Sequence, residues 1–548
     1  MTPRMHGSRP RFPRWLGALV LPLWLVSCGG GDGGGGGGGE GHDVSSVAIQ
    51  GRVSYDFVPA TISAGLNYAN ITSRPARGVQ VVAVADDGRE LASTRAGADG
   101  SFTLTVPVKT SVRLRAKARL LQAPGAGASW DFSVRDNTSA GYAQGNAALY
   151  TVQSEAFDSG SSATLARDLH AGSGWTGSGY GQARAAAPFA ILDQFYSAIE
   201  KIRAVDPGVA FPAMNAYWSI NNRPANGDPS LGEITTSHWR SAGATPGLYI
   251  LGKADVDTDE YDTGVIVHEW GHYFESRLSR SDSTGGPHGG GEVLDMRLAF
   301  GEAWGNALAG MVRDDPLYID TNGPRQARSG LAFDLGLFSA DEPAGWFNEA
   351  AVQTLLYKTY RAPQLGFDAI YRVMTGPQKS TPAFTSLFTF ATYLRAGADA
   401  DGQAVLDGLL ADIQTVHGAP LDIWGTHQAW PQSLASVPEH ESKVLPIYTS
   451  LTLGAQPARL CATDELGVEG NKLGNRRYYR FAVASSAAYK LEFTEGDASV
   501  VEVRGSGGEV ALQEIDDQTV GLNLTPGEYV MAILPKPIKS CFSVRVFQ

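Results

Sequence analysis

Two histidines four residues apart, His268 and His272, constrain this chain more than any other feature. They lie in His268-Glu269-Trp270-Gly271-His272, directly after the apolar residues 265–267. Residues four apart share one face of an α-helix, and the pattern predicts a helix over residues 263–278. Asp262 stands at its N-cap, where a carboxylate can accept amide hydrogens of the first turn. We therefore expect a buried helix that carries both imidazoles on one side.

Two imidazoles placed in this way can bind one zinc ion. Zinc acidifies bound water, and the neighbouring carboxylate of Glu269 can accept the proton as a general base and pass it to a leaving amine. A surface helix with unrelated histidines is the alternative interpretation. A third histidine ligand six residues after His272 is excluded, because Leu278 occupies that position.

A catalytic zinc needs a third protein ligand, and Glu302 is the candidate. It lies on a predicted helix over residues 298–313, in Gly301-Glu302-Ala303-Trp304-Gly305-Asn306. Glu292 and Asp295 compete for this role but lack that surrounding sequence.

Together the two motifs resemble those of gluzincins, the thermolysin and fungalysin type of zinc peptidase, over roughly residues 247–360. The resemblance implies the ligands His268, His272 and Glu302. It also implies that the residue four after Glu302 orients a ligand histidine through a hydrogen bond. Asn306 stands there in place of an acid, and its amide oxygen can still accept from an imidazole N–H.

The residue that stabilises the oxyanion is open. Gluzincins carry a histidine in the approach to the helix predicted over residues 348–361, where this chain has Trp346. Tyr357 or His427 can take the role. The alternative interpretation for each is a packing or surface residue. His288, in a glycine-rich loop, is an alternative ligand or substrate contact, although a solvent-facing loop histidine is the favoured interpretation.

An acidic run precedes the histidine helix: Asp255, Asp257, Asp259, Glu260 and Asp262. Its start resembles a calcium-binding EF-hand loop. The pattern then fails, because Glu260 replaces the required glycine and Ile266 the required bidentate glutamate. We favour a solvated acidic loop or local capping, with calcium as the alternative. A strand predicted over residues 247–252 suits a peptide laid along a sheet edge.

The first 28 residues predict a lipoprotein signal. Four arginines precede a short apolar run that ends at Cys28, which we expect to be lipidated. An ordinary signal peptide is the alternative. Residues 29–39 are glycine except for Asp32 and predict a flexible tether. Removing the four arginines takes the formal charge from −12 to −16, which argues against a nucleic-acid partner. Cys461 and Cys541 remain, and a disulfide is the default in an oxidising compartment.

We therefore predict a multidomain α+β protein. Residues 1–27 are the signal peptide, and residues 28–45 the lipidated cysteine and tether. Residues 46–118 resemble the transthyretin-like sandwich of carboxypeptidase regulatory domains. Residues 119–454 are expected to form a mainly helical, zincin-like domain with a small sheet. Residues 455–548 resemble a prepeptidase C-terminal β-sandwich, whose first and last strands Cys461 and Cys541 would join.

The predicted function is that of a zinc metallopeptidase anchored by lipid in a bacterial cell envelope, at the outer membrane or cell surface. Its partners would be a peptide or protein substrate and the membrane, and we expect a monomer. Two alternatives stay open: a surface binding or adhesion lipoprotein with a relict zinc site, and a zinc hydrolase of a non-peptide bond.

Overall fold

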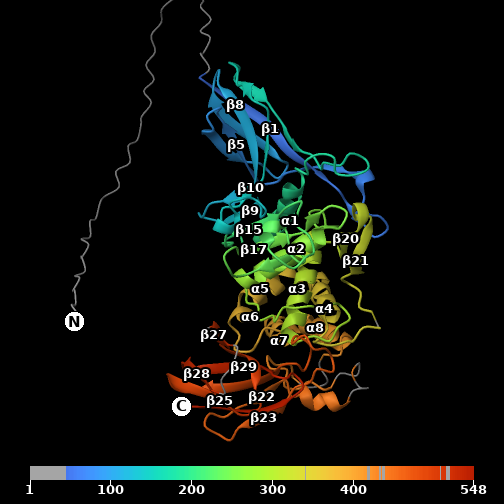
Figure 1. Ribbon diagram of the computed structural model, residues 1–548, viewed down its shortest axis with the longest axis vertical. Helices are drawn as coiled ribbons and strands as arrows, with labels where there is room; N and C mark the ends of the chain where they lie inside the picture. Colours follow the sequence, from blue (N-terminus) through green and yellow to red (C-terminus); the bar gives the residue numbers. More distant parts are fainter. Residues whose placement is uncertain are drawn as a thin grey trace, which may run out of the picture. The chain divides into compact units, whose positions relative to one another are not determined.

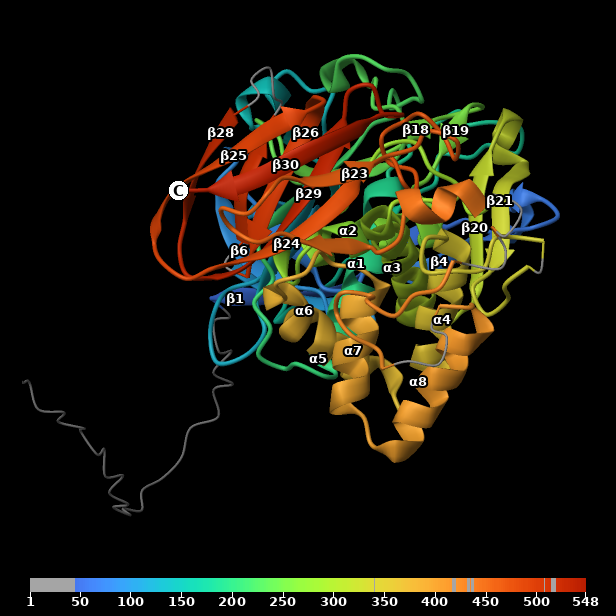
Figure 2. The same cartoon turned by 90° about the horizontal axis from the view of Figure 1, so that it is seen from below.

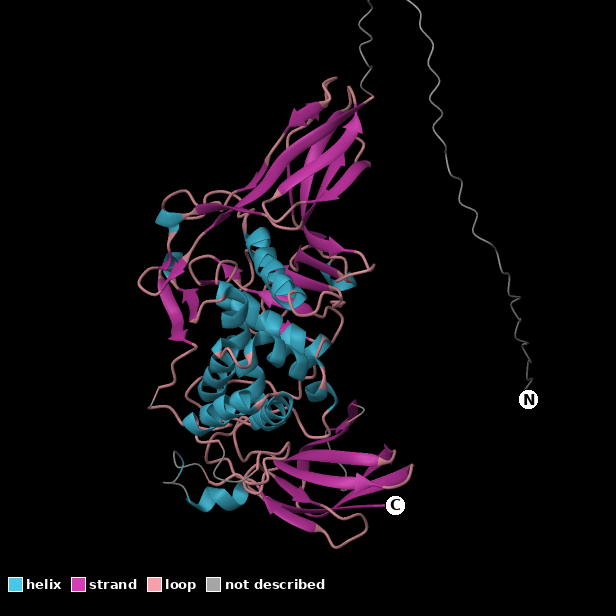
Figure 3. Ribbon diagram, turned by 180° about the vertical axis from the view of Figure 1, so that it is seen from behind, coloured by secondary structure: helices cyan, strands magenta, loops and turns pink. Residues whose placement is uncertain are grey.

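A computed structural model describes residues 45–339, 341–415, 420–430, 434, 438–506, 508–513 and 519–548. The predicted signal peptide, Cys28 and the glycine tether up to residue 44 lie outside these residues. Among the described residues, no helix is both long enough and apolar enough to cross a membrane. The chain is rich in strands, and its helices gather in the middle of the sequence (Figures 1 and 3).

Two sheets dominate the first part of the described chain (Figure 1). The long first strand β1 is the centre of a five-stranded sheet. Apolar side chains alternate with exposed ones along β7, so one face of this sheet is buried. The five strands are β1 (Ser46–Phe57), β4 (Thr72–Pro75), β7 (Ser101–Pro107), β13 (Thr164–Ala166) and β14 (Leu169–Ala171).

The second sheet is longer and runs in the order β16-β17-β15-β9-β8-β5-β6, with β10 beside β9 and with β11 and β12 beside β8. Its strands are β5 (Val79–Val84), β6 (Glu90–Arg95), β8 (Ser111–Gln122), β9 (Trp130–Asp136), β10 (Ala148–Leu149), β11 (Thr151–Gln153), β12 (Phe157–Asp158), β15 (Met214–Trp218), β16 (His238–Arg240) and β17 (Gly247–Ile250). Strand β8 crosses the predicted domain boundary at residue 118, and the sheet continues into the next part of the chain.

Strand β17 is not at the edge of this sheet. It pairs in parallel with β15 on one side and antiparallel with β16 on the other. The expectation that a peptide could lie along the strand at residues 247–252 is therefore wrong in this form, because β16 already occupies its hydrogen-bonding edge.

Two small sheets complete this part of the chain. Strands β2 (Ala60–Thr61) and β3 (Gly65–Leu66) form a hairpin. A four-stranded sheet has the order β18 (Gly252–Lys253), β19 (Asp257–Thr258), β20 (Leu317–Asn322) and β21 (Arg328–Asp334).

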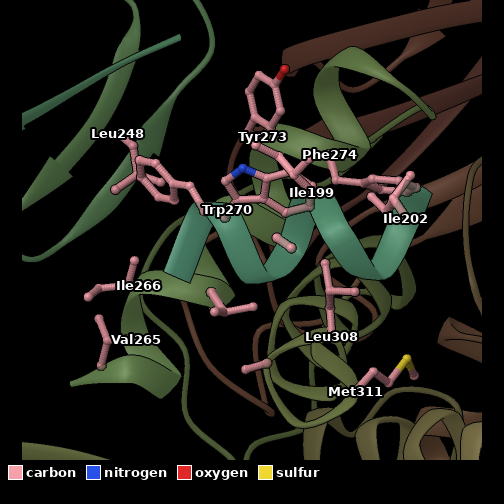
Figure 4. Close-up of a cluster of buried hydrophobic side chains, with 14 of the residues drawn as sticks. Ile199, Ile202, Leu248, Val265, Ile266, Trp270, Tyr273, Phe274, Leu308 and Met311 are labelled. Atoms are coloured by element: carbon pink, nitrogen blue, oxygen red, sulfur yellow. The ribbon is translucent and has the colours of Figure 1, made fainter. Parts of the chain in front are cut away.

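The helices are α1 (Ala187–Arg203), α2 (Thr263–Arg277), α3 (Met296–Arg313), α4 (Glu349–Arg361), α5 (Gly366–Thr375), α6 (Pro377–Ser380), α7 (Leu387–Gly397) and α8 (Ala400–Asp412). Helices α2 and α3 are buried on nearly every side, so their polar side chains must find partners inside the protein. Figure 4 shows how apolar side chains of α1, β17, α2 and α3 meet in one core.

The C-terminal part forms two further sheets around a separate apolar core (Figure 2). One has the order β22 (Tyr448–Ser450), β24 (Arg477–Val483), β29 (Gly527–Pro535), β26 (Ala498–Gly505) and β27 (Gly508–Gln513). The other has the order β23 (Ala458–Cys461), β30 (Cys541–Phe547), β25 (Ala487–Glu495) and β28 (Thr519–Leu524). Cys461 and Cys541 form a disulfide between the paired strands β23 and β30.

Candidate metal centre

Glycines let α2 and α3 approach closely where the two sequence motifs meet. A Cβ atom on Gly271 would lie 3.0 Å from the Cα of Gly305, and one on Gly305 would lie 2.9 Å from the ring of His268. The indole N–H of Trp304 donates to the carbonyl of Gly271 across the same contact, at 3.2 Å. The helix with the histidines and the helix with Glu302 are therefore fitted to each other through motif residues.

This contact brings His268, His272 and Glu302 together. The Nε2 atoms of the two histidines lie 3.0 Å apart, and Oε2 of Glu302 lies 3.2 Å from the first and 3.3 Å from the second. Zinc with bonds of about 2.0–2.1 Å in tetrahedral geometry places its donors roughly 3.3–3.4 Å apart. The three donor atoms are thus slightly closer together than the corners of one face of a zinc tetrahedron, and near enough to share one ion.

Asn306 holds His268 from behind. Its Oδ1 lies 2.7 Å from Nδ1 of His268, while its Nδ2 donates to Oε1 of Glu349 and to Oε1 of Gln353, both at 2.7 Å. Since Nδ2 faces two acceptors, Oδ1 accepts the imidazole N–H, and Nε2 of His268 keeps its lone pair for a metal. The side chain at position 306 faces two acceptors, Glu349 and Gln353, and one donor, His268, so it must both donate and accept.

Glu275 faces the second histidine and was missed by sequence reasoning as a site residue. It is 1% exposed, and its Oε2 lies 3.8 Å from Nδ1 of His272. Its position three residues after His272, on the same helix face, was the available signal. A buried carboxylate behind a ligand imidazole is a common partner in zinc sites.

His288 reaches the centre from the loop between α2 and α3. Its Nε2 lies 3.4 Å from Oε2 of Glu302, and its Nδ1 lies 3.0 Å from Oε2 of Glu349. His288 is exposed in its loop, as the favoured interpretation expected, but its ring also contacts two buried glutamates of the centre. It lies outside the group of donor atoms that are all within 4.8 Å of one another, which comprises His268, His272 and Glu302.

The C-terminal part of the chain holds the loop that carries His288. Nδ2 of Asn471 donates to the carbonyls of Gly285 and Pro287, at 3.0 Å each. Nζ of Lys472, a residue that is 3% exposed, donates to the same Pro287 carbonyl and to Glu292, at 2.9 Å each. This pairing also removes Glu292 as a third-ligand candidate.

The charged groups of the centre shift one another's pKa values. Burial favours the neutral form of Glu302, but His272, His268 and His288 outweigh it and hold the pKa of this carboxyl well below its usual range. The pKa of His272 is well above its usual value, because Glu302 and Glu275 outweigh the effect of burial. Burial alone would lower the pKa of His288, but Glu349 and Glu302 outweigh it and raise that pKa to about 9. An anionic Glu302 suits a divalent cation.

Tyr357 and His427, the two candidates for oxyanion stabilisation, have no contact with the triad among the described residues. The Tyr357 ring is buried beside Gly310 and Tyr360, and His427 is exposed. Trp346 belongs to the apolar core.

Asp295 pairs with Arg297 and accepts from Tyr478, so it is not a third ligand either. Tyr318 of β20 is instead the tyrosine beside the centre, with its ring centroid 6.3 Å from that of His268.

The second half of the acidic run is not a solvated loop, although Asp255 at its start is exposed. Asp259, Glu260 and Asp262 are 3%, 0% and 0% exposed. Asp262 occupies the N-cap position of α2, but its side chain accepts no bond from the first turn; its Oδ2 accepts from Thr321 N and Oγ1 instead, at 2.7 and 2.9 Å. Both the solvated-loop and the capping interpretations are therefore wrong for these residues.

Comparisons with known proteins assign no family. No protein-family model matches the chain, and no curated protein matches its sequence. The pre-peptidase C-terminal domain of a Bacillus anthracis collagenase is 12% identical, with a TM-score of 0.15, over 18% of this chain and 93% of its own. PliG, a periplasmic inhibitor of g-type lysozyme from Aeromonas hydrophila, is 12% identical, with a TM-score of 0.13, over 18% of this chain and 96% of its own.

The major plantain pollen allergen is 13% identical, with a TM-score of 0.13, over 23% of this chain and 94% of its own. A domain of the kind expected for residues 455–548 is thus among the weakly similar structures. Likeness at these scores carries no argument about function, and the gluzincin resemblance stays a prediction.

Proposed function

We propose that the chain is a zinc-dependent peptidase whose metal ligands are His268, His272 and Glu302. The observation that carries this proposal is the triangle of donor atoms with edges of 3.0, 3.2 and 3.3 Å. Two imidazole nitrogens and one carboxylate oxygen are a donor set typical of catalytic zinc, and they leave one position of a tetrahedron open. The peptide bond as substrate rests on the resemblance of the two motifs to those of gluzincins.

Each residue around the triad has a role in this proposal. When bound, zinc supplies Lewis-acid chemistry, which polarises a carbonyl and acidifies water. Glu269, buried next to the first ligand, accepts the proton from water and returns it to the leaving amine. Asn306 holds the imidazole of His268 through a hydrogen bond, and the carboxylate of Glu275 faces that of His272 as a charge partner.

His288 is the substrate-facing imidazole of the proposal. Its side chain is 29% exposed, whereas that of Glu302 is 10% exposed, so it borders the open side of the centre. An N–H there can donate to the oxygen that gains negative charge as the carbonyl is attacked. It thus takes the role for which sequence analysis offered Tyr357 or His427.

The proposed location rests on the leader alone. Cys28 would carry the lipid, and the glycine tether would hold the enzyme off the membrane surface, outside the cytoplasm.

Zinc content and peptide cleavage test this function together. We expect about one zinc per wild-type chain and cleavage of members of a peptide library. Glu269→Gln should keep the zinc and lose activity by on the order of 100-fold or more, because only the proton transfer is removed. His272→Ala should lose both.

Glu200→Gln is the matched control, since it changes an exposed glutamate on α1 in the same way and should leave both readouts unchanged. Zinc binding without cleavage of any peptide would overturn the peptidase and favour a binding role. Full activity of Glu269→Gln would overturn the mechanism.

A further inference from the structure

A second group of metal-binding side chains lies in the small sheet beside α2. Asp257 of β19, Asp259 directly after it and Asp320 of β20 each offer a carboxylate oxygen, and these oxygens all lie within 4.8 Å of one another. Asp262 approaches the same group, since its carboxylate binds Thr321, the neighbour of Asp320. We call these four residues the aspartate cluster. They come from two segments about 60 residues apart that the fold brings together.

The ion pairs of the described residues leave the aspartate cluster without a countercharge. The adjacent Glu260 is neutralised by an ion pair with Arg184, and both side chains are buried. By contrast, no arginine or lysine in the described part of the chain forms an ion pair with any member of the aspartate cluster. Four carboxylates this close together, two of them buried and two partly buried, repel one another strongly unless a cation lies between them.

Individual oxygens in the aspartate cluster also lack hydrogen-bond donors. Oδ2 of Asp259 accepts from Oγ of Ser237, but its Oδ1 has no partner among the described residues, although the residue is 3% exposed. Oδ1 of Asp262, which is fully buried, and Oγ1 of Thr258 are also without partners. Buried polar atoms without partners are rare in folded proteins and call for a ligand that the oxygens can bind.

Burial and mutual repulsion shift the pKa values of these groups. Burial, together with the charge of Asp320, raises the pKa of Asp257 to about 7. Burial raises the pKa of Asp320 to about 6. For Asp259 and Asp262 the same two causes raise the pKa well above the usual value.

We propose that the aspartate cluster binds one calcium ion. The donors are all oxygens, which a hard cation prefers and which distinguish this site from the histidine-containing zinc triad. Calcium accepts six to eight oxygens in flexible geometry, so carboxylates, a threonine hydroxyl and backbone carbonyls can share it. Magnesium requires a stricter octahedron and keeps more of its water.

Calcium at this place would connect the start of α2 to β20. Asp262 immediately precedes α2, and Tyr318 of β20 packs against Gly264 in its first turn, with a Cβ on that glycine 3.1 Å from the tyrosine ring. The ion would thus fix the base of the helix that carries both histidines. The proposal does not depend on zinc or on catalysis.

The test is calcium binding by the full chain, stripped of metal and then measured with and without added zinc. Isothermal titration should give one site per chain, and Ca²⁺ should raise the melting temperature more than the same concentration of Mg²⁺. Asp320→Asn and Asp259→Asn should each lower calcium affinity on the order of 10- to 100-fold, because each removes a charged ligand. Asp401→Asn, an exposed change on α8, is the matched control and should bind like the wild type.

Three results would overturn the proposal: no calcium-dependent rise in the wild-type melting temperature, an equal rise with Mg²⁺, or wild-type affinity in both cluster variants. Asp320 is only partly buried, so its variant remains informative if Asp259→Asn does not fold. His272→Ala should keep the calcium response, which separates failure at this site from failure at the zinc centre.

Discussion

Replacing Asn306 by aspartate is the sharpest test of the reasoning about the metal centre. From the motif alone, an acid at this position would strengthen the hydrogen bond to His268 and tighten zinc binding. The structure predicts the opposite. The Nδ2 group of Asn306 donates to Glu349 and to Gln353 at 2.7 Å each, and an aspartate would turn an acceptor towards both.

The cost has two parts. The hydrogen bond to the charged Glu349 contributes about 1.5–3 kcal/mol, and the bond to the neutral Gln353 about 0.5–1.5 kcal/mol. Two carboxylates about 4 Å apart at an effective dielectric constant of about 20 repel by about 4 kcal/mol, part of which rotation and water relieve. We therefore expect Asn306→Asp to lower the free energy of unfolding by roughly 3–6 kcal/mol.

Two assays measure this effect. Urea unfolding of the metal-free chain can be followed through tryptophan fluorescence, since Trp270 and Trp304 are fully buried beside the centre. Competition with a chromophoric chelator gives the zinc affinity, which should fall on the order of 10- to 100-fold as His268 loses its fixed orientation.

Glu349→Gln completes a double-mutant cycle with Asn306→Asp. An amide at position 349 can donate to the new carboxylate, so the double variant should be more stable than Asn306→Asp alone, with a coupling energy of about 2 kcal/mol or more. Asn306→Ala removes the donor without adding charge and should be less damaging than Asn306→Asp. If Asn306→Asp binds zinc more tightly than the wild type and unfolds at higher urea, the reasoning is refuted.

Three further outcomes are expected. Replacing glycine by alanine inside a helix normally stabilises the helix by about 1 kcal/mol. In Gly305→Ala the new Cβ would lie 2.9 Å from the His268 ring, so both zinc affinity and thermal stability should fall. A rise in stability at unchanged zinc affinity would contradict this contact. Lys472→Met should leave zinc content intact and lower kcat, because it frees the loop that carries the third histidine; unchanged kcat would show that the loop needs no such support. Burial alone would raise the pKa of Asp295, but Arg297 outweighs it and lowers that pKa. The ionised Asp295 therefore stabilises the fold above about pH 4, and this contribution is lost as the pH falls further. The urea midpoint should decline less steeply in acid for Asp295→Asn than for the wild type, and equal slopes would contradict the ion pair.

The helices of the centre could be predicted from the sequence because the residues that determine each helix lie close together in the chain. The observed α2, Thr263–Arg277, lies within the predicted range of 263–278, and α3 begins two residues before the predicted start at 298. The motif Gly301-Glu302-Ala303-Trp304 indicated a ligand, and its tryptophan is a packing residue. The next residue, Gly305, is a packing residue as well. Gly305 receives the His268 ring, and Trp304 donates to α2. Because these residues make the contact between the two helices, the spacing of the motif indicates the contact from the sequence alone.

The remaining site residues depend on contacts that no short pattern contains. His288 reaches Glu302 because its loop is held by Asn471 and Lys472, more than 180 residues away. Asp320 joins Asp257 only through the pairing of β19 with β20. The position of β17 inside its sheet depends likewise on β16. Sequence reasoning weighed His288 and Asp257 by their neighbours in the chain and did not consider Asp320. For each of these residues the deciding neighbour lies far away in the sequence.

The pairing of buried acidic side chains connects the two metal proposals. Most charges in a protein interior need a partner, and a first set of buried acids in the described residues is paired with arginine. That set comprises Asp193, Glu260, Asp282, Asp295 and Glu502.

The buried acids without an arginine fall into two places only, within the described part of the chain. Glu269, Glu275, Glu302 and Glu349 surround the histidines, and Asp259 and Asp262 belong to the aspartate cluster. Buried acids elsewhere in the described residues are paired with arginine, whereas these two groups are not. We therefore infer that a metal cation balances the charge of each group. Chelation should therefore destabilise both regions, with zinc restoring the first and calcium the second; a chain that melts identically with and without both ions would contradict this single explanation.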